Sequence, residues 1–344
     1  MAGIFKFTFG PWNIHEGADP FGPVVRKTVE FDRKLEFYKE LGYDAIQFHD
    51  DDAVPELNKL TTLQIVEAAQ NLRKRLSDKG LAAEFVAPRL WEDQRTIDGG
   101  YTANSEKDRK YALERSKIAI DIAEELGTDL IVLWLAREGS YIREAKDSKV
   151  AVERIVEAIN AMLEYHPTIR ICIEPKPNEP MDMAYIPTAG HAIALGMLTV
   201  DPKRVGVNIE SAHAILANLD PSDEMGYALA HKKLWTVHLN DQNGLKFDQD
   251  KSFGSVDLRR AFNQVRILDK HDYGKKGEYV GMDVKAMRTQ KNEVATKHLT
   301  NSREIFMKLL EISRSLDDSY IEKCRAELNY EELDLYIMKA LLGS

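Results

Sequence analysis

The stretch ICIEPKPNEP, residues 171–180, joins the end of an apolar β-type run to a rigid polar segment. The apolar run stops at Glu174, and Lys176 follows it between Pro175 and Pro177. Proline fixes the backbone φ angle and cannot continue a central strand. We therefore expect the chain to leave a buried strand here and to hold Glu174 and Lys176 at its rim. This pair suits a metal site with a polar substrate or a plain salt bridge, and the motif in isolation favours the salt bridge.

The predicted strand that ends here is one of eight in the chain. Their residue ranges are 4–9, 44–48, 82–87, 129–134, 170–173, 204–209, 234–239 and 278–282. Most are uniformly apolar, which is typical of parallel strands that are covered on both faces. Between them lie segments with apolar residues at helical spacing, over residues 24–41, 62–79, 106–126 and 148–165, and the first three of these end at a glycine.

Eight strands that alternate with helices predict an α/β fold, a (β/α)8 TIM barrel. An open, doubly wound sheet is the alternative, but no Gly-x-Gly-x-x-Gly motif follows the first strand. We expect the catalytic barrel to span residues 1–300. Residues 301–344 are expected to add the last barrel helix, over 301–316, and a shortened C-terminal helical tail, over 320–342.

The composition of the chain excludes several classes of partner. The 344 residues are 44% hydrophobic and 30% charged, as is normal for a soluble globular protein. The net charge is −9, and no run of lysine and arginine stands out, so we expect no nucleic-acid partner. The two cysteines, Cys172 and Cys324, make neither a disulfide framework nor a cysteine metal site, which favours a reducing cytosol.

The chain also lacks the patterns of secreted and membrane proteins. Its first residues have no charged start followed by an apolar core, so they do not predict a signal peptide. The longest apolar runs are too short to cross a bilayer. The sequence thus predicts a cytoplasmic protein with no membrane partner.

The ends of the predicted strands carry side chains that bind metals or stack on substrates. Barrel enzymes place their chemistry at the carboxyl ends of the strands. Here the residues at or just after those ends are, in order, Trp12, His49, Trp91, Trp134, Glu174, Glu210, His238 and Asp283. A random loop would be richer in serine, glycine, asparagine and lysine.

Two further clusters add carboxylate and imidazole groups. In NIESAH, Glu210 and His213 lie three residues apart and point the same way if the strand passes into a helical turn. In FDQD, Asp248 and Asp250 share a face of an extended backbone. Together with the strand ends they supply about six to eight ligands, which is enough for two divalent ions.

In FHDDD, His49 precedes three aspartates, residues 50–52. A neighbouring aspartate can fix the tautomer of a histidine and raise its basicity, as an acid–base catalyst requires. A run of aspartates is most often a loop or helix-cap cluster, and a lone histidine is usually structural. It is the combination of this motif with the other strand ends that favours a functional site.

The chain resembles xylose isomerase, a sugar aldose–ketose isomerase with a (β/α)8 fold, in its shorter form. The resemblance covers nearly the whole chain and lies in FTFGPWN, DPFG, FHDDDAVP, DGGYTANS, the REG after Trp134, IEPKPNEP, NIESAH, HLNDQNGLKFDQD and MDVKAMRT. It implies isomerisation of D-xylose to D-xylulose, or of D-glucose to D-fructose. It also implies two divalent metal ions per subunit, as Mn²⁺, Co²⁺ or Mg²⁺, and a small-molecule sugar as the partner.

The resemblance also implies roles for individual residues. The first metal would be held by Glu174, Glu210, His238 and Asp283, and the second by Glu210, His213, Asp248 and Asp250. His49, oriented by Asp52, would assist opening of the sugar ring, and Lys176 would polarise the carbonyl oxygen at C1. Trp12 and Trp134 would form the apolar walls of the substrate pocket.

The sequence departs from the family at several positions. His238 stands where the family usually has an aspartate, which would weaken Mg²⁺ and favour Mn²⁺ or Co²⁺. The histidine either ligates in place of the aspartate or turns away, and we expect ligation. Trp91 replaces a phenylalanine, and Leu135 and Ala136 replace two glycines, which we expect to add bulk near the pocket.

The oligomeric state is expected to differ from that of the tetrameric members. Phe21, in DPFG, resembles the aromatic residue that reaches into the pocket of a neighbouring subunit. The long C-terminal arm that embraces a neighbour in the tetrameric members is largely missing here. We therefore expect a homodimer.

Two other interpretations remain open. The chain could be a related barrel enzyme with different chemistry, such as an epimerase, a dehydratase or the barrel subunit of a C-glycoside deglycosidase, because fold alone never decides function. It could also be a non-catalytic sugar-binding or scaffold protein. The joint presence of Lys176, His49, Asp52 and the pair Asp248 and Asp250 favours the isomerase.

Overall fold

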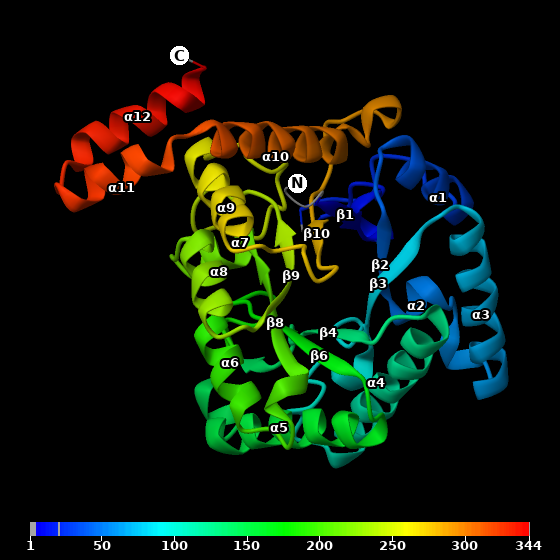
Figure 1. The fold of residues 1–344 in the computed structure, drawn as a ribbon. Helices are drawn as coiled ribbons and strands as arrows, with labels where there is room; N and C mark the ends of the chain where they lie inside the picture. The colour runs from blue at the N-terminus through cyan, green and yellow to red at the C-terminus, as the bar shows by residue number, and fades with distance from the viewer. Residues whose placement is uncertain (1–4, 20, 344) are drawn as a thin grey trace.

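The computed structural model of the chain describes residues 5–19 and 21–343. Eight parallel strands close into a barrel in the order β1-β10-β9-β8-β6-β4-β3-β2, with helices around them (Figure 1). The prediction of a (β/α)8 barrel is thus confirmed. The barrel strands are β1 Lys6–Phe9, β2 Ala45–His49, β3 Ala82–Ala87, β4 Leu130–Trp134, β6 Arg170–Glu174, β8 Val205–Glu210, β9 Leu234–Leu239 and β10 Tyr279–Met282.

All eight predicted strands are present, with ends that differ by at most two residues; Ile4, predicted to start the first, lies outside the described residues. Two short strands, β5 Gly139–Ser140 and β7 Met183–Ala184, form a separate antiparallel pair. β7 lies beyond IEPKPNEP, so the polar segment is tied back to the loop after β4. Tyr185 N donates to Glu138 O at 3.0 Å, which ties the segment to that loop.

The helices alternate with the strands along the chain. They are α1 Phe31–Glu40, α2 Asp50–Ala53, α3 Thr62–Asp78, α4 Glu106–Leu126, α5 Ser148–Tyr165, α6 Ala189–Met197, α7 Ser211–Leu216, α8 Pro221–Ala230, α9 Leu258–Lys270, α10 Lys297–Ser315, α11 Asp318–Ala326 and α12 Tyr330–Leu342. Short 3-10 turns are η1 Pro11–Asn13, η2 Leu57–Lys59, η3 Gln94–Thr96, η4 Arg143–Ala145, η5 Pro202–Arg204 and η6 Asn292–Val294.

Local signals explain several helix ends. The side chain of Thr61 accepts a hydrogen bond from Gln64 N and caps the start of α3. Gly127 ends α4 in the left-handed region, with φ 82°, a conformation that glycine adopts at no steric cost. The predicted ends of α3 and α4, each placed before a glycine, agree with the structure to within one residue.

Two helix predictions were wrong in extent. The helix predicted over 24–41 begins only at Phe31, because Arg26 ties the preceding segment to the loop after β10. Its Nη1 donates to Met287 O at 2.9 Å and to Gln290 O at 3.1 Å, and its own backbone N–H bonds to Glu16 O. The segment therefore satisfies its polar groups without forming a helix.

The tail predicted as one helix over 320–342 is two helices. The break lies between α11 and α12, where Leu328 adopts φ 54°, a left-handed conformation that no helix continues. The two helices pack on each other at the edge of the molecule beyond α10, with the rings of Tyr320 and Tyr336 4.9 Å apart (Figure 1).

The barrel interior below the carboxyl ends contains a buried polar group. Glu84, from β3, accepts hydrogen bonds from Gln47 Nε2 at 3.0 Å and from Thr236 Oγ1 at 2.7 Å. Burial raises the pKa of Glu84, and these hydrogen bonds oppose the shift. Within the described residues, no helix is long and apolar enough to cross a membrane.

Candidate metal and substrate site

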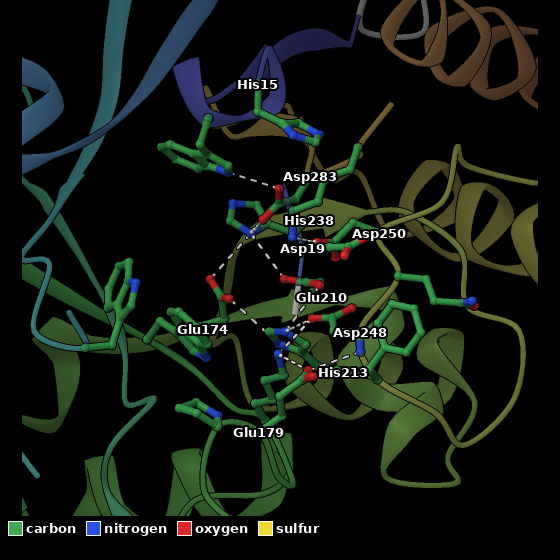
Figure 2. Close-up of a pocket in the computed structure, with 18 of the residues that line it drawn as sticks. His15, Asp19, Glu174, Glu179, Glu210, His213, His238, Asp248, Asp250 and Asp283 are labelled. Carbon is green, nitrogen blue, oxygen red and sulfur yellow. Dashed lines mark hydrogen bonds and ion pairs between the residues drawn. The ribbon is translucent and has the colours of Figure 1, made fainter. Parts of the chain in front are cut away.

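The carboxyl ends of the barrel strands surround a cavity of about 920 Å³ (Figure 2). Twelve of the fourteen side chains predicted for the site line it: Trp12, His49, Trp91, Trp134, Glu174, Lys176, Glu210, His213, His238, Asp248, Asp250 and Asp283. The other two, Asp52 and Phe21, lie beside it. Because parallel strands all end at one face of the barrel, residues more than 200 positions apart meet there.

His238 points into the group of carboxylates rather than away from it. Its Nδ1 lies 3.4 Å from Glu174 Oε2, 3.7 Å from Glu210 Oε2 and 3.7 Å from Asp283 Oδ2 (Figure 2). The imidazole is buried at the end of β9, and β8 and β10 on either side bring Glu210 and Asp283 to it. The strand register therefore places the histidine where a donor atom could reach a shared cation.

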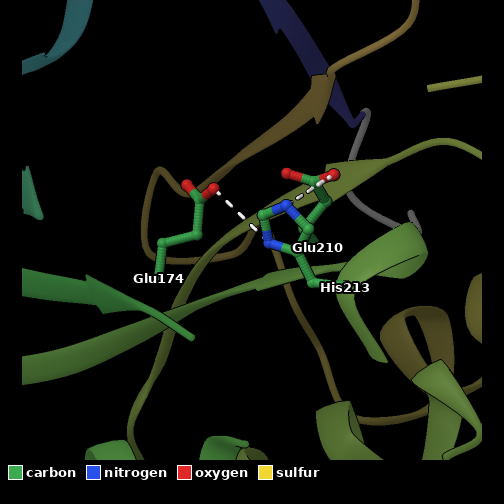
Figure 3. A group of neighbouring side chains, drawn as sticks. All are labelled: Glu174, Glu210 and His213. Atoms are coloured by element: carbon green, nitrogen blue, oxygen red, sulfur yellow. Dashed lines mark ion pairs between the residues drawn. The ribbon is translucent and has the colours of Figure 1, made fainter. Parts of the chain in front are cut away.

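A second group of donors forms around His213. Its Nε2 lies 3.3 Å from Glu210 Oε1, and its Nδ1 lies 3.7 Å from Glu174 Oε1 (Figure 3). The same Nε2 lies 3.1 Å from Asp248 Oδ2 (Figure 2). Glu210 ends β8 and His213 lies in the first turn of α7, as the spacing in NIESAH predicted. Asn240 Nδ2 joins Glu210 Oε1 at 2.9 Å to Asp250 Oδ1 at 3.1 Å, which sets the spacing of these two carboxylates.

Three sets of donor atoms are close enough to hold a cation. They are Glu174, Glu210 and His213; Glu210, His238 and Asp283; and Glu210, Asp248 and Asp250. Glu210 belongs to all three, which is compatible with a carboxylate shared between two ions. Glu174 lies near both imidazoles, whereas the family resemblance assigns it to the first metal alone.

Unpaired buried atoms test whether these residues fit a metal. Among the described residues, His238 Nδ1 and Nε2, His213 Nδ1 and Asp248 Oδ1 are buried without a hydrogen-bond partner. Buried polar atoms are nearly always paired, so such a concentration at one place indicates a missing partner. Imidazole nitrogens combined with carboxylate oxygens suit a divalent ion of intermediate hardness, so the donor set fits.

The electrostatics of the cluster lead to the same conclusion. Burial, followed by the charges of Asp248 and Asp250, raises the pKa of Glu210 well above its usual value. Burial and the charge of Asp248 do the same to the pKa of Asp250. The crowding of buried carboxylates is costly unless protons or cations neutralise them.

Two lysines supply part of the positive charge. Lys176 Nζ lies 2.8 Å from Asp248 Oδ2 and 3.2 Å from Glu179 Oε2. Burial works to lower the pKa of Lys176, but the charges of Asp248 and Glu179 outweigh it and raise the pKa above its usual value. Lys176 is therefore an ammonium group. The salt bridge that the motif suggested between Glu174 and Lys176 is not formed, because Lys176 pairs with Asp248 and Glu179 instead.

Lys285, which the sequence analysis did not single out, pairs with Asp250. Asp250 and nearby carboxylates raise its pKa against the effect of burial. The sequence feature that could have identified Lys285 is its position in MDVKAMRT. It lies two residues after Asp283, just beyond the carboxyl end of β10, where side chains reach the rim of the cavity. Each aspartate of FDQD is thus neutralised by one lysine.

Three tryptophans and His49 form one wall of the cavity. The ring of Trp12 lies 4.1 Å from that of His49, His49 lies 5.1 Å from Trp91, and Trp91 lies 4.6 Å from Trp134. Trp12 Nε1 also donates to Asp283 Oδ1 at 3.0 Å, which links this wall to the carboxylates. Lys176 Nζ lies 5.1 Å from the centre of the Trp134 ring, so the ammonium group faces the same wall.

The sequence also led to expectations about Leu135, Ala136 and Phe21. Leu135 and Ala136 are buried next to Glu138 and are not among the residues that line the cavity, so the bulk that they were expected to add near the pocket lies outside the cavity itself. Phe21 is 73% exposed and its ring lies 5.1 Å from that of Phe247, at the cavity mouth.

His49 is held as its motif predicted, and by one residue more. His49 Nδ1 lies 2.8 Å from Asp52 Oδ2. Burial works to raise the pKa of Asp52, but the hydrogen bond and the charge of His49, together with Arg89, lower it overall. Arg89, which the sequence analysis did not identify, follows β3 and reaches the same imidazole.

The protein is therefore a closed (β/α)8 barrel with a group of carboxylate and imidazole side chains, able to hold a cation, at the carboxyl face of the barrel. More specifically, the chain belongs to the xylose isomerase-like TIM barrel family, whose model matches residues 35–283.

Solved structures of low sequence identity share the fold. A D-tagatose 3-epimerase-like protein is 17% identical, with a TM-score of 0.63 over 90% of this chain and 98% of that one. 3-Keto-D-glucoside 4-epimerase from E. coli is 15% identical, with a TM-score of 0.64 over 88% and 99%. The IOLI protein, solved with a bound zinc atom, is 15% identical, with a TM-score of 0.61 over 90% and 100%. At these identities the likeness concerns the fold alone.

Proposed function

We propose that this protein is a metal-dependent sugar isomerase that interconverts an aldose and a ketose. D-xylose and D-xylulose are the first candidate pair, and D-glucose and D-fructose the second. The observation that carries the proposal is the position of Lys176. Its ammonium group lies in the same cavity as the carboxylate and imidazole cluster, facing Trp134. A fixed positive charge so placed stabilises negative charge that grows on a carbonyl oxygen.

The proposed metal ligands are those that the family resemblance implies. Glu174, Glu210, His238 and Asp283 would hold one divalent ion, and Glu210, His213, Asp248 and Asp250 a second. When bound, such ions supply Lewis-acid stabilisation of negative charge on the oxygens of the substrate. The unpaired nitrogens of His238 and His213 support this assignment.

The remaining residues would bind the sugar and move its protons. His49, in contact with Asp52, would transfer a proton during opening of the sugar ring. Lys176 would orient and polarise the carbonyl group at C1. The tryptophan wall would exclude water from C1 and C2, which disfavours proton exchange with solvent and permits a direct hydride shift between the two carbons.

A sugar epimerase is the second candidate. This function needs only one cation. The set Glu210, His238 and Asp283 offers three donor atoms to a single cation, without the second group of donors around His213. Several of the structural neighbours are named as epimerases or epimerase-like proteins. An epimerase would invert one carbon next to a carbonyl group by removing and returning a proton, and Glu174 and Glu210 are the carboxylates available for this step.

One experiment separates the two candidates. The protein, loaded with Mn²⁺, is incubated in D2O with a panel of pentoses and hexoses, and the products are identified by NMR and mass spectrometry. An isomerase that works by hydride shift gives the ketose with almost no deuterium at C1 or C2. An epimerase gives an epimer with one deuterium at the inverted carbon. If no sugar on the panel is converted, both proposals fail.

We also infer that the protein is a homodimer. Exposed apolar side chains next to each other often mark an interface, and Phe21 and Phe247 form such a pair at the mouth of the cavity.

Light scattering of the wild type is expected to give the mass of a dimer. Phe21→Asp is expected to shift the equilibrium toward the monomer. Leu63→Asp, at a similarly exposed position that does not line the cavity, is the control and is expected to leave the dimer intact. A monomeric or tetrameric wild type would contradict the inference.

A further inference from the structure

One nitrogen of His49 lies within hydrogen-bond distance of two different groups. Nδ1 is 2.8 Å from Asp52 Oδ2 and 2.7 Å from Arg89 Nη2. Arg89 Nη2 is itself 3.2 Å from Asp52 Oδ2, so the three atoms form a triangle. A neutral imidazole nitrogen carries either a hydrogen or a lone pair, and it cannot satisfy both contacts at once.

Arg89 is held firmly in this position. Its backbone N donates to Asp50 Oδ1 at 3.1 Å and its Nε to Asp51 Oδ1 at 2.7 Å. Arg115 in turn holds Asp50 through a 2.7 Å contact from Nε and Asp51 through a 3.1 Å contact from Nη2. The aspartates of FHDDD, of which Asp50 is fully buried, therefore form a scaffold that directs Arg89 at His49, and a guanidinium does not deprotonate in proteins.

His49 is held just as firmly. Its ring lies between Trp12 and Trp91, at centroid distances of 4.1 Å and 5.1 Å. Its side chain is only 11% exposed and lines the cavity. Among the described residues, no hydrogen bond reaches its Nε2. The partner of Nδ1 thus decides what Nε2 presents to the cavity.

The two contacts of Nδ1 have opposite consequences. If Nδ1 carries hydrogen and donates to Asp52, Nε2 has a free lone pair and accepts a proton. If Nδ1 accepts from Arg89, Nε2 carries the hydrogen and donates it. In the second case the two hydrogens of Arg89 Nη2 serve Nδ1 and Asp52 together, so the aspartate keeps a partner.

We propose that Arg89 is a positioning residue that competes with Asp52 for His49 Nδ1 and shifts the imidazole toward the tautomer with hydrogen on Nε2. The tautomer assignment stands on geometry alone, whereas its use in ring opening rests on the proposed function. An arginine bound to the imidazole opposes the usual effect of the aspartate, which is to keep the hydrogen on Nδ1.

Ring opening of a sugar needs both states of Nε2. The anomeric hydroxyl loses its proton, the C1–O bond to the ring oxygen breaks with its electron pair going to that oxygen, and a C1 carbonyl forms. The ring oxygen ends with a proton. Both oxygens are attached to C1, so one imidazole can accept the proton from the first and return it to the second. Having accepted the proton, His49 is an imidazolium ion, and the positive charge of Arg89 beside Nδ1 favours the return of the proton to the ring oxygen.

The tautomer is measured directly by long-range ¹H–¹⁵N NMR on the Zn²⁺-loaded protein without substrate, because the two nitrogens have distinct shifts in each tautomer. The chain has nine histidines, and His49→Gln identifies the signal of His49. Arg89→Met is expected to move the population toward hydrogen on Nδ1 by about tenfold or more. Asp52→Asn is expected to move it the opposite way.

Two variants guard against indirect effects. Arg95→Met removes an arginine that pairs with Asp93 outside this triangle, and it is expected to leave the His49 shifts unchanged. Arg89→Lys keeps the charge but has no planar fork with which to hold Asp51, Asp52 and Nδ1 together, so it is expected to restore the wild-type shifts only in part. Circular dichroism checks that each variant is folded.

The outcome separates this inference from the proposed function. Wild-type shifts in a folded Arg89→Met protein would overturn the inference, even if the protein isomerises sugars. Altered shifts in a protein that converts no sugar would support the tautomer assignment while the proposed function fails. With a convertible pentose, Arg89→Met is expected to lower kcat by about tenfold with KM nearly unchanged, whereas loss of substrate binding alone would raise KM.

Discussion

At the scale of single residues, His238 decides the chemistry of the metal cluster. An imidazole in place of a carboxylate removes one negative charge and offers nitrogen, which Mg²⁺ binds poorly compared with Mn²⁺ or Co²⁺. The sequence identified the residue but left open whether it turns inward. Only the pairing of β9 with β8 and β10 brings Nδ1 within 3.4–3.7 Å of Glu174, Glu210 and Asp283.

We predict that a chelator abolishes turnover and that Mn²⁺ or Co²⁺ restores it better than Mg²⁺, by about tenfold or more in affinity. His238→Asp is expected to narrow this difference, because it returns an oxygen ligand and a negative charge. Titration calorimetry measures the affinities. His231→Asp, at an exposed histidine far from the cavity, is the matched control. Equal recovery of the wild type with Mg²⁺ would contradict a nitrogen ligand.

Lys176 is the residue on which the isomerase proposal depends. We predict that Lys176→Met lowers kcat by about 10²–10³, the usual effect of removing one group that stabilises developing negative charge. The variant should remain folded, as judged by circular dichroism. Lys110→Met, at an exposed position of α4, controls for the loss of a lysine as such. A near-normal rate in Lys176→Met would exclude the carbonyl-polarising role.

At the scale of elements, the break between α11 and α12 is the place where the spacing of apolar residues gave a wrong prediction. Apolar residues continue at helical spacing through 320–342, so periodicity predicted one helix. The chain turns at Leu328, whose φ of 54° lets α12 fold back and pack on α11. Tertiary packing of two short helices outweighs the local cost of a left-handed leucine.

We predict that Leu328→Gly leaves the stability of the tail unchanged or raises it by up to about 1 kcal/mol, because glycine adopts positive φ without strain. Leu335→Gly, inside α12, is expected to lower it by about 1 kcal/mol. Both leucines are exposed, so lost burial is a small part of either effect. Hydrogen exchange of the α12 amides measures the difference. If Leu328→Gly were the more damaging change, the helix would not be broken at this residue.

At the scale of the whole molecule, a buried histidine is expected to make the stability of the folded state depend on pH. His298, on α10, approaches Asn13 O through Nε2 at 2.8 Å, and its Nδ1 has no hydrogen-bond partner among the described residues. Burial lowers the pKa of His298 from 6.5 to about 4. The folded state therefore binds fewer protons than the unfolded state between these values.

We predict that stability falls as the pH is lowered from about 6.5 to about 4, with His298 contributing roughly 3 kcal/mol over this window. The sign follows because the unfolded state takes up the proton first and is favoured by acid. His298→Gln, whose amide can still donate to Asn13 O, is expected to flatten the dependence of Tm on pH. His231→Gln, at an exposed site, is the control. An unchanged slope in His298→Gln would contradict the assignment.

The alternation of apolar runs with amphipathic segments predicted the barrel and the bounds of its eight strands to within two residues, because the periodicity of apolar residues is a property of local sequence. The residue types at the strand ends likewise determined which side chains face the cavity. Only the tertiary structure decided the contacts across the chain: the inward turn of His238, the pairing of Lys176 with Asp248, and the reach of Arg89 to His49. These contacts join residues 40 to 72 positions apart, and closing the barrel is what brings them together.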